Sequence, residues 1–151
     1  MSLFEAEIQK ILPEIVSFRH DLHMHPELGF EELRTADRIA EVLSGVGNLD
    51  IQTQVARTGV VALLNGSRSG PCVALRADID ALPITEETGL DYASRNVGRM
   101  HACGHDGHTS VLVGAARVLS RFADQLPGKV KFIFQPAEEN FGGGRDIVQA
   151  G

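Results

Sequence analysis

The N-terminal residues carry apolar side chains at the three-to-four spacing of an amphipathic helix. This spacing predicts a helix over residues 4–23 that ends before Pro26, because the residue before a proline avoids helical backbone. Pro13 lies inside this range, where a proline can kink a helix. The apolar positions are Phe4, Ile8, Ile11, Leu12, Ile15, Phe18 and Leu22.

A second helical pattern covers about residues 30–43 and is followed by Gly45 and Gly47, which are typical helix stops. Its predicted core positions are Leu33, Ala36, Ile39, Ala40 and Leu43. We expect the opposite face to lie in solvent. That face carries Glu31, Glu32, Arg34, Asp37 and Arg38.

The pattern then changes to the period of strands. Residues 51–56 alternate, residues 60–64 are nearly all apolar, and residues 65–71 form a polar turn, which predicts a hairpin followed by a strand. Two further apolar runs, 72–77 and 129–134, predict strands that are buried on both faces.

Helical spacing returns at residues 109–122, between these last two strands. Buried strands separated by helices indicate an α/β fold with a mixed, largely parallel central sheet flanked by helices. Cys72 lies in an apolar run, so we expect it to be a core residue.

Composition narrows the function. Lys and Arg number 14 against 20 Asp and Glu, a net charge of -6, and no basic tract is interleaved with aromatics, so nucleic acid is not expected as a partner. The apolar runs are too short to span a membrane, and the first residues lack the pattern of an export signal. We therefore expect a soluble, cytoplasmic protein of 151 residues that forms one domain or part of one.

Candidate chemistry is densest in residues 100–109, which contain one of the two cysteines and three of the six histidines. Cys103 and His105 are two positions apart, so in extended backbone their side chains leave the same face, and Gly104 lets the chain bend. Thiolate and imidazole are ligands that zinc prefers. A structural zinc module remains an alternative, although such a site needs four protein ligands.

Two pairs of acids follow predicted strands. Asp78 and Asp80 share a face, and two buried like charges require a cation, a shared proton or an arginine such as Arg76. Glu138 and Glu139 point in opposite directions if the backbone is extended, so one can hold a metal while the other moves a proton. Alternatively, acids at a helix start only favour the helix dipole.

Three further histidines, His20, His23 and His25, lie near the end of the first predicted helix. Histidines at a helix C-terminus interact favourably with its exposed carbonyl groups. We therefore expect these three side chains to have a structural role.

Together, residues 19–28, 75–83, 100–109 and 135–139 resemble the motifs of one family, the metal-dependent amidohydrolases. This family includes hippurate hydrolase, N-acyl-amino-acid amidohydrolase and the auxin-conjugate hydrolases, and is related to the M20-type metallopeptidase clan. The resemblance implies a zinc-exopeptidase-like catalytic domain that hydrolyses the amide bond of N-acyl amino acids, such as hippurate-like substrates. A dipeptidase or desuccinylase of the wider clan is the alternative.

The resemblance also implies site residues. Cys103, His105 and Glu139 match ligands of a centre with two divalent metal ions, which can be Zn, Mn, Co or Ni. Glu138 matches the general base that activates a metal-bound hydroxide, and Asp80 matches an acid beside the centre. Asp78 stands at a position where other branches of the clan place a ligand, so its role stays open, as does that of His101. No metal role carries over to Asp106 or His108, although both belong to the motif.

Members of this family are longer than this chain and have two further histidine ligands after the glutamate pair. We therefore expect residues 1–151 to be the N-terminal portion of the catalytic domain, without the dimerisation or lid domain. By this interpretation the chain alone is inactive, and its full-length form is a homodimer or a larger oligomer.

Overall fold

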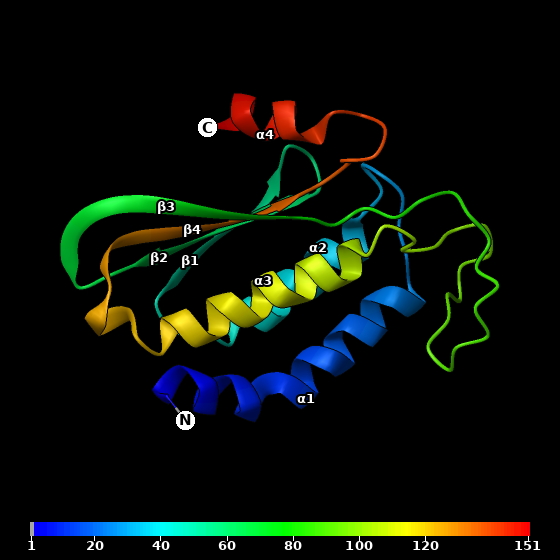
Figure 1. Ribbon diagram of the computed structural model, residues 1–151. Helices are drawn as coiled ribbons and strands as arrows, with labels where there is room; N and C mark the ends of the chain where they lie inside the picture. The colour runs from blue at the N-terminus through cyan, green and yellow to red at the C-terminus, as the bar shows by residue number, and fades with distance from the viewer. Residues whose placement is uncertain (1) are drawn as a thin grey trace.

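A four-stranded sheet divides the structure into layers (Figure 1). The computed structural model describes residues 2–151. The strands are β1 (Leu49–Val55), β2 (Gly59–Asn65), β3 (Arg68–Asp78) and β4 (Pro127–Gln135). The helices are α1 (Leu3–Met24), α2 (Leu33–Ser44), α3 (His105–Ser120) and α4 (Gly143–Ala150), with a 3₁₀ turn at Ala123–Gln125. Helices α1, α2 and α3 lie on one side of the sheet, and α4 lies on the other (Figure 1).

The spatial order of the strands is β1-β2-β4-β3. β1 and β4 both run antiparallel to β2, whereas β3 and β4 are parallel. The predicted mixed sheet flanked by helices is confirmed, but it is partly rather than largely parallel within residues 2–151, because one of its three pairings is parallel. Because Asp78 pairs with Gln135, the chain leaves β3 and β4 at the same edge of the sheet. The segments after both strands therefore lie close together.

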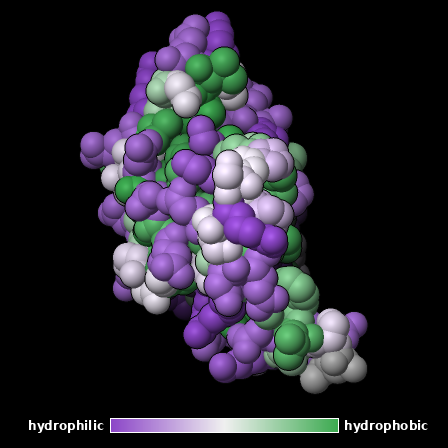
Figure 2. Space-filling model, turned by 90° about the vertical axis from the view of Figure 1, so that its left-hand side faces the viewer, coloured by the Kyte–Doolittle hydropathy of each residue, from purple (hydrophilic) through white to green (hydrophobic). Residues whose placement is uncertain are grey.

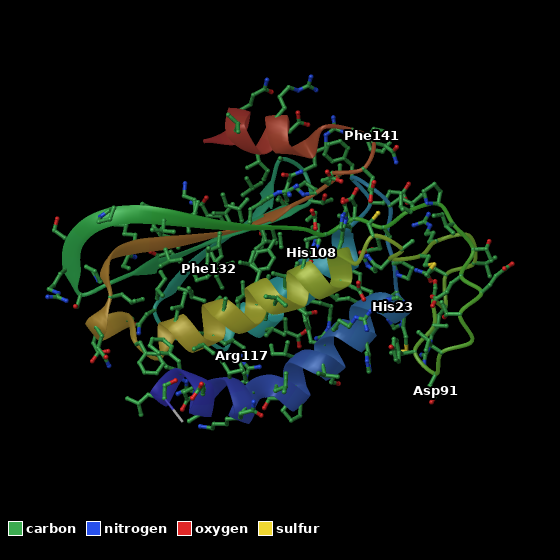
Figure 3. All side chains as sticks on the ribbon, viewed as in Figure 1. His23, Asp91, His108, Arg117, Phe132 and Phe141 are labelled. Carbon is green, nitrogen blue, oxygen red and sulfur yellow. The ribbon has the colours of Figure 1, made fainter. Side chains whose placement is uncertain are left out.

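The core lies between the sheet and helices α2 and α3. Val60 of β2 lies opposite Phe134 of β4, and Ala62 lies opposite Phe132, so alternate side chains of both strands face the helices. Phe132 and Phe134 are fully buried, and Figure 3 labels Phe132 in the layer between the sheet and α3. The helices contribute Ile39, Leu43, Leu112, Val113 and Ala116 to the same cluster.

The first predicted helix is confirmed as α1, within about one residue at each end. Ser2 and Glu5 form a capping box, in which the Glu5 N–H donates to Ser2 Oγ at 3.2 Å and the Ser2 N–H donates to Glu5. The helix contains Pro13 and ends with His25 as its C-cap, directly before Pro26.

The predicted faces of the second helix are wrong at its start. Helix α2 begins at Leu33, whose side chain is 64% exposed, whereas Glu32 is fully buried. The reason is that Glu32 is the N-cap residue and turns inward to accept hydrogen bonds from Thr58 and Ala137. The third helix also differs, because α3 begins at His105, four residues before the predicted start.

The prediction that Cys72 is a core residue is also wrong, because Cys72 is exposed. β3 lies at the edge of the sheet, and among the described residues only β4 pairs with it. It begins at Arg68, inside the predicted turn, and it is buried only at Ala77 and Asp78. The molecular surface on the left-hand side of Figure 1 accordingly shows hydrophobic residues between hydrophilic ones (Figure 2).

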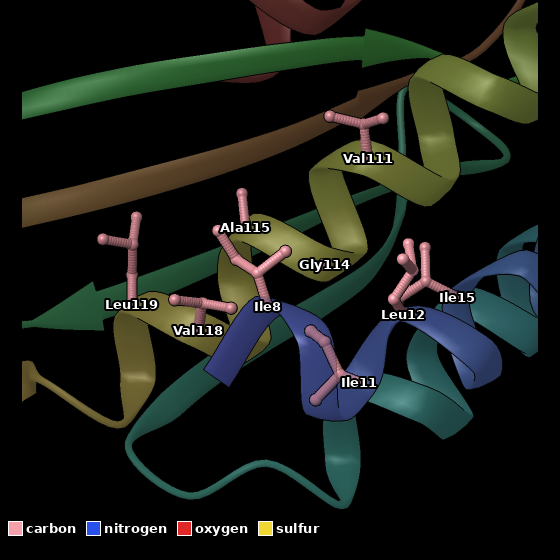
Figure 4. A pocket seen from close by; sticks show the side chains of 9 residues that line it. All are labelled: Ile8, Ile11, Leu12, Ile15, Val111, Gly114, Ala115, Val118 and Leu119. Carbon is pink, nitrogen blue, oxygen red and sulfur yellow. The ribbon is translucent and has the colours of Figure 1, made fainter. Parts of the chain in front are cut away.

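Helices α1 and α3 pack together along an open apolar groove of about 430 Å³ (Figure 4). The lining residues of the groove are Ile8, Ile11, Leu12, Ile15, Val111, Gly114, Ala115, Val118 and Leu119.

None of the helices in residues 2–151 is both long and apolar enough to cross a membrane.

Candidate metal centre

The candidate ligands meet where the ends of β3 and β4 approach the start of α3. Gly104 is the N-cap of α3 and has a φ of +81°, a conformation that glycine adopts without strain. His105 is the first residue of the helix, so the extended backbone expected for Cys103 to His105 is wrong. The left-handed turn at Gly104 nevertheless leaves the two side chains close together.

One atom each of Cys103, His105 and Glu139 forms a cluster in which all three atoms lie within 4.8 Å of one another. His105 Nε2 is 3.7 Å from Glu139 Oε1. Cys103 is exposed, His105 is buried and Glu139 is partly buried, so the cluster opens to solvent on one side. Thiolate, imidazole and carboxylate are the donors that zinc and similar divalent ions bind, so these side chains fit such an ion.

Asp80 supports two members of this cluster from behind. His105 Nδ1 lies 2.9 Å from the backbone oxygen of Asp80 and 3.3 Å from its Oδ1. The backbone N–H of Glu139 donates to Asp80 Oδ2 at 3.0 Å. Because Nδ1 of His105 is occupied, Nε2 is the nitrogen that faces Glu139. This is the arrangement in which an outer carboxylate orients a metal-binding histidine.

The charges around the cluster favour a cation. Burial alone would raise the pKa of Asp80, but hydrogen bonds from His105 and backbone amides lower it overall, so the carboxylate stays ionised. Burial alone would lower the pKa of His105, but Asp80 and Asp78 raise it overall. The Glu139 carboxylate, with a smaller effect of burial, raises the pKa of Cys103 to about 11. A metal ion that binds Cys103 as a thiolate must therefore displace a proton.

Glu138 precedes the candidate ligand Glu139 and is exposed. The two acids do not lie on extended backbone as expected, because residues 138–141 form a turn and Ala137 has a φ of +51°. They still have different surroundings, since the Glu139 side chain is 19% exposed and lies beside His105.

A second cluster consists of Asp78, His105 and His108, and it shares His105 with the first. Asp78 Oδ1 is 2.7 Å from His108 Nδ1, and Asp78 Oδ2 is 3.2 Å from Arg76 Nη1. The ion pair proposed as an alternative to a metal at Asp78 is therefore present. Figure 3 labels His108 near the start of α3. Each cluster within residues 2–151 has three candidate ligands, fewer than the four of a closed structural zinc site.

The histidines near the end of α1 lie outside both clusters. His23 is buried, with Nδ1 2.8 Å from Asp106 and Nε2 3.2 Å from Glu86. His25 Nδ1 lies 2.8 Å from the backbone oxygen of Asp21, and the ring of His20 stacks on Tyr92. These contacts agree with the structural role expected for the three histidines.

His101 is buried, with its ring centroid 6.4 Å from that of His23. Burial lowers its pKa to about 4, so the ring is neutral at physiological pH. Asp106, next to His105 in sequence, is also buried and binds Arg19 at 2.8 Å in addition to His23. The sequence patterns did not identify the contacts of Asp106, because its partners are more than 80 residues away.

The profile of Peptidase family M20/M25/M40 matches residues 74–151, and the chain belongs to this family. The matched region includes the end of β3, all of α3 and β4, and therefore both clusters. This finding confirms the resemblance inferred from the four sequence motifs.

The relatives include several amidohydrolases and deacetylases. An N-acyl-L-amino acid amidohydrolase of Geobacillus stearothermophilus is 46% identical over 145 residues, which are 95% of this chain and 39% of the relative. An N-acetylcysteine deacetylase of Bacillus subtilis is 46% identical over 137 residues, or 91% of this chain and 36% of the relative. The chain thus spans less than half the length of these relatives.

Solved structures show the same fold. A putative aminohydrolase from methicillin-resistant Staphylococcus aureus superposes with a TM-score of 0.93 at 41% identity, covering 99% of this chain and 40% of the other. The YXEP protein of Bacillus subtilis, described as a dinuclear metal binding peptidase from the M20 family, superposes with a TM-score of 0.87 at 44% identity. The match covers 97% of this chain and 40% of the YXEP chain.

Proposed function

We propose that residues 1–151 are the N-terminal portion of the catalytic domain of a metal-dependent hydrolase that cleaves the amide bond of N-acyl amino acids. The observation that carries the proposal is the convergence of Cys103, His105 and Glu139, with Asp80 bonded to both His105 and Glu139. The names of the relatives support this substrate class, because they include N-acyl-amino-acid amidohydrolases and deacetylases.

In this proposal, three side chains would hold a divalent ion: the Cys103 thiolate, His105 through Nε2, and the Glu139 carboxylate. When bound, such ions lower the pKa of water towards about 7 and polarise the carbonyl group of a substrate. The complete site has two ions, drawn from Zn, Mn, Co and Ni, and takes its further ligands from outside these 151 residues.

Glu138 acts as the general base. It is exposed beside the ligand Glu139, so its carboxylate can take a proton from the attacking water and return it to the leaving amine. Asp80 keeps the ring of His105 oriented with Nδ1 bonded and Nε2 turned to the cluster. The products are a carboxylate and a free amino acid. The full-length form is proposed to be a homodimer or a larger oligomer.

The 151 residues alone should be inactive or nearly so. Three protein ligands leave a bound ion exposed to water on its open side, and the chain covers 39% of its amidohydrolase relative. The rate of benzoyl-glycine hydrolysis with the isolated chain should not exceed the rate in the same metal-containing buffer without protein. Turnover by the isolated chain would show that the site is complete without further segments.

The substrate class is tested on the full-length protein with benzoyl-glycine and acetylated amino acids, compared with unblocked dipeptides. We expect a higher kcat/KM on the N-acyl substrates. A clear preference for unblocked dipeptides would favour the dipeptidase alternative instead.

The role of Glu138 is tested in the same protein by the variant Glu138→Gln. We expect kcat to fall by at least about 100-fold, because general-base catalysis is lost, while metal content stays the same. Glu41→Gln, which changes an exposed acid on α2, is the matched control and should keep full activity. An active Glu138→Gln variant would show that another group moves the proton.

A further inference from the structure

Three loops that are distant in sequence meet at the carboxylate of Glu32. Its side chain is fully buried at the start of α2. Oε1 accepts a hydrogen bond from the backbone N–H of Ala137 at 2.8 Å, and Oε2 accepts one from the Thr58 hydroxyl at 2.5 Å. One carboxylate thus joins α2, the turn between β1 and β2, and the segment that follows β4.

The segment after β4, whose Ala137 N–H donates this hydrogen bond, has little space to move. Ala137 is fully buried and has a φ of +51°, which only the surrounding structure can maintain in a residue other than glycine. A Cβ at Gly29 would lie 3.1 Å from Ala137, and a Cβ at Gly143 would lie 1.8 Å from the backbone oxygen of Pro136. Chain segments therefore enclose this backbone closely on two sides.

Aromatic and cationic side chains connect the same three loops at the surface. The Arg57 guanidinium lies over the Phe30 ring, 4.2 Å from its centroid, and the Phe30 ring centroid is 5.7 Å from that of Phe141. Phe30 and Arg57 also have positive φ angles. Figure 3 labels Phe141 in the loop between β4 and α4. The loops are thus held together both at the buried carboxylate and at the surface.

The segment fixed in this way leads directly to the candidate metal ligand. Glu138 and Glu139 follow Ala137, so the path of residues 135–137 determines where their carboxylates lie. Asp80 binds the backbone N–H of Glu139, and Glu32 binds the backbone N–H of Ala137 two residues earlier. The two acids therefore hold successive points of the same loop from different elements of the fold.

We infer that Glu32 is a positioning residue, which fixes the backbone of residues 135–139 and thereby places Glu139 against Cys103 and His105. The inference rests on the proposed function, because it takes these three residues as metal ligands. A buried carboxylate is costly unless it is hydrogen-bonded, and burial raises the pKa of the Glu32 carboxyl above its usual value. A purely structural role would change the stability of the fold and leave metal binding unchanged.

The test is a titration of the protein with Co(II), which is followed through the thiolate-to-metal absorption band that Cys103 would give. Glu32→Ala should weaken Co(II) binding about 10- to 100-fold, the usual effect of losing a group that supports metal ligands. Glu32→Gln should bind Co(II) nearly as tightly as the unchanged protein, because the amide oxygen can accept from the Ala137 N–H and the amide nitrogen can donate to Thr58 Oγ1.

Asp21→Ala is the matched control. Asp21 also joins two elements, since it binds Arg34 at 2.8 Å and Arg38 at 3.2 Å, but these bonds connect α1 with α2 rather than with the loop after β4. This variant should lose stability in urea and keep the Co(II) affinity of the unchanged protein.

Glu32→Ala that binds Co(II) with unchanged affinity and spectrum would overturn the inference. If Glu32→Ala fails to fold, Thr58→Val replaces it, since this variant removes one of the two hydrogen bonds and keeps the carboxylate. Thr58→Val should weaken Co(II) binding severalfold, and unchanged binding would again overturn the inference. If the unchanged protein gives no thiolate band with Co(II), the proposed metal site is itself wrong, and the inference fails with it.

Discussion

His23 and His105 are buried to nearly the same extent, with 4% and 5% of their surface exposed, yet their surroundings differ. Both ring nitrogens of His23 face carboxylates, those of Asp106 and Glu86. His105 has Nδ1 bonded to Asp80, whereas its Nε2 makes no hydrogen bond within residues 2–151. This nitrogen lies 3.6 Å from Asp78 Oδ1 and 3.7 Å from Glu139 Oε1, in the cluster that includes Cys103. We call His23 with Asp106 and Glu86 the closed cluster. We call the first cluster described above, Cys103, His105 and Glu139, the open cluster. The partners of the second nitrogen, rather than burial, therefore decide whether a histidine can bind a metal.

The largest expected difference is in metal affinity. His105→Ala removes a ligand from the open cluster and should weaken zinc binding by at least about a thousandfold, or roughly 4 kcal/mol. His23→Ala removes a histidine that has no nitrogen free for a metal, so zinc affinity should stay unchanged. Calorimetric titration of both variants measures this. Equal losses in the two variants would remove the distinction between the clusters.

Stability should show the opposite ranking. His23→Ala leaves Asp106 and Glu86 buried without their common partner, and we expect the free energy of unfolding to fall by about 3 kcal/mol. In the absence of metal, His105→Ala should have a smaller effect, because Asp80 keeps its bond to the Glu139 N–H. Urea denaturation of the metal-free variants measures both values. A larger loss in His105→Ala would mean that the open cluster also contributes the more to folding.

A smaller effect is expected from Asp80, which orients His105 without belonging to the cluster of three ligands. Asp80→Asn keeps an oxygen for the Glu139 N–H but loses the negative charge beside the imidazole. Zinc affinity should fall about tenfold, at the lower end of the range for outer-shell partners. The same calorimetric titration checks it, and Asp91→Asn, which changes an exposed acid in the loop after β3, serves as the control.

The smallest effect concerns pH and the closed cluster. Burial alone would raise the pKa of Glu86, but hydrogen bonds from Thr88, the Ser94 N–H and His23 lower it overall. A carboxyl group with a lowered folded pKa stabilises the protein above its unfolded pKa, and this contribution is lost as pH falls through the folded value. Glu86→Gln should therefore reduce the difference in unfolding free energy between pH 6 and pH 3, measured in urea. An unchanged difference would show that Glu86 is not held ionised by folding.

Elements whose patterns depend on local periodicity could be predicted from the sequence. Helix α1 has seven apolar positions at helical spacing, and the apolar runs 60–64 and 129–134 mark strands β2 and β4. The expected burial of 129–134 on both faces is wrong, because Phe132 and Phe134 are fully buried whereas Lys129 is exposed. The period of each element separates one face from the other, and Phe18 and Leu22 of α1 are buried on the core side, whereas Phe4, Ile8 and Leu12 near the start of the helix are exposed.

Burial that depends on distant partners could not be predicted. Cys72 lies in an apolar run like that of a central strand, but its exposure follows from the position of β3 at the edge of the sheet. Glu32 is adjacent to Glu31, and nothing local separates the exposed acid from the buried one. The partners of Glu32 are 26 and 105 residues away, so only the fold brings them together.

The candidate site could be predicted only in part, because its residues also come from distant parts of the sequence. Cys103 and His105 stand in a dense group of possible ligands, and the acid pairs after two predicted strands also stood out. The family resemblance then assigned roles to Glu139, Glu138 and Asp80. Crowding also suggested His101, whose ring is buried without a hydrogen-bond partner among the described residues. Which of the four crowded side chains converge depends on the left-handed turn at Gly104 and on the loop after β4, which local spacing does not reveal.

The central claim is that the open cluster binds a metal through Cys103, and X-ray absorption at the zinc edge tests it most directly. The zinc-loaded protein should show one sulfur neighbour at about 2.3 Å together with nitrogen or oxygen neighbours at about 2.0–2.1 Å. The sulfur should disappear in Cys103→Ser and remain in Cys72→Ser, which changes the other exposed cysteine. A spectrum without sulfur, or a sulfur that persists in Cys103→Ser, would contradict the account.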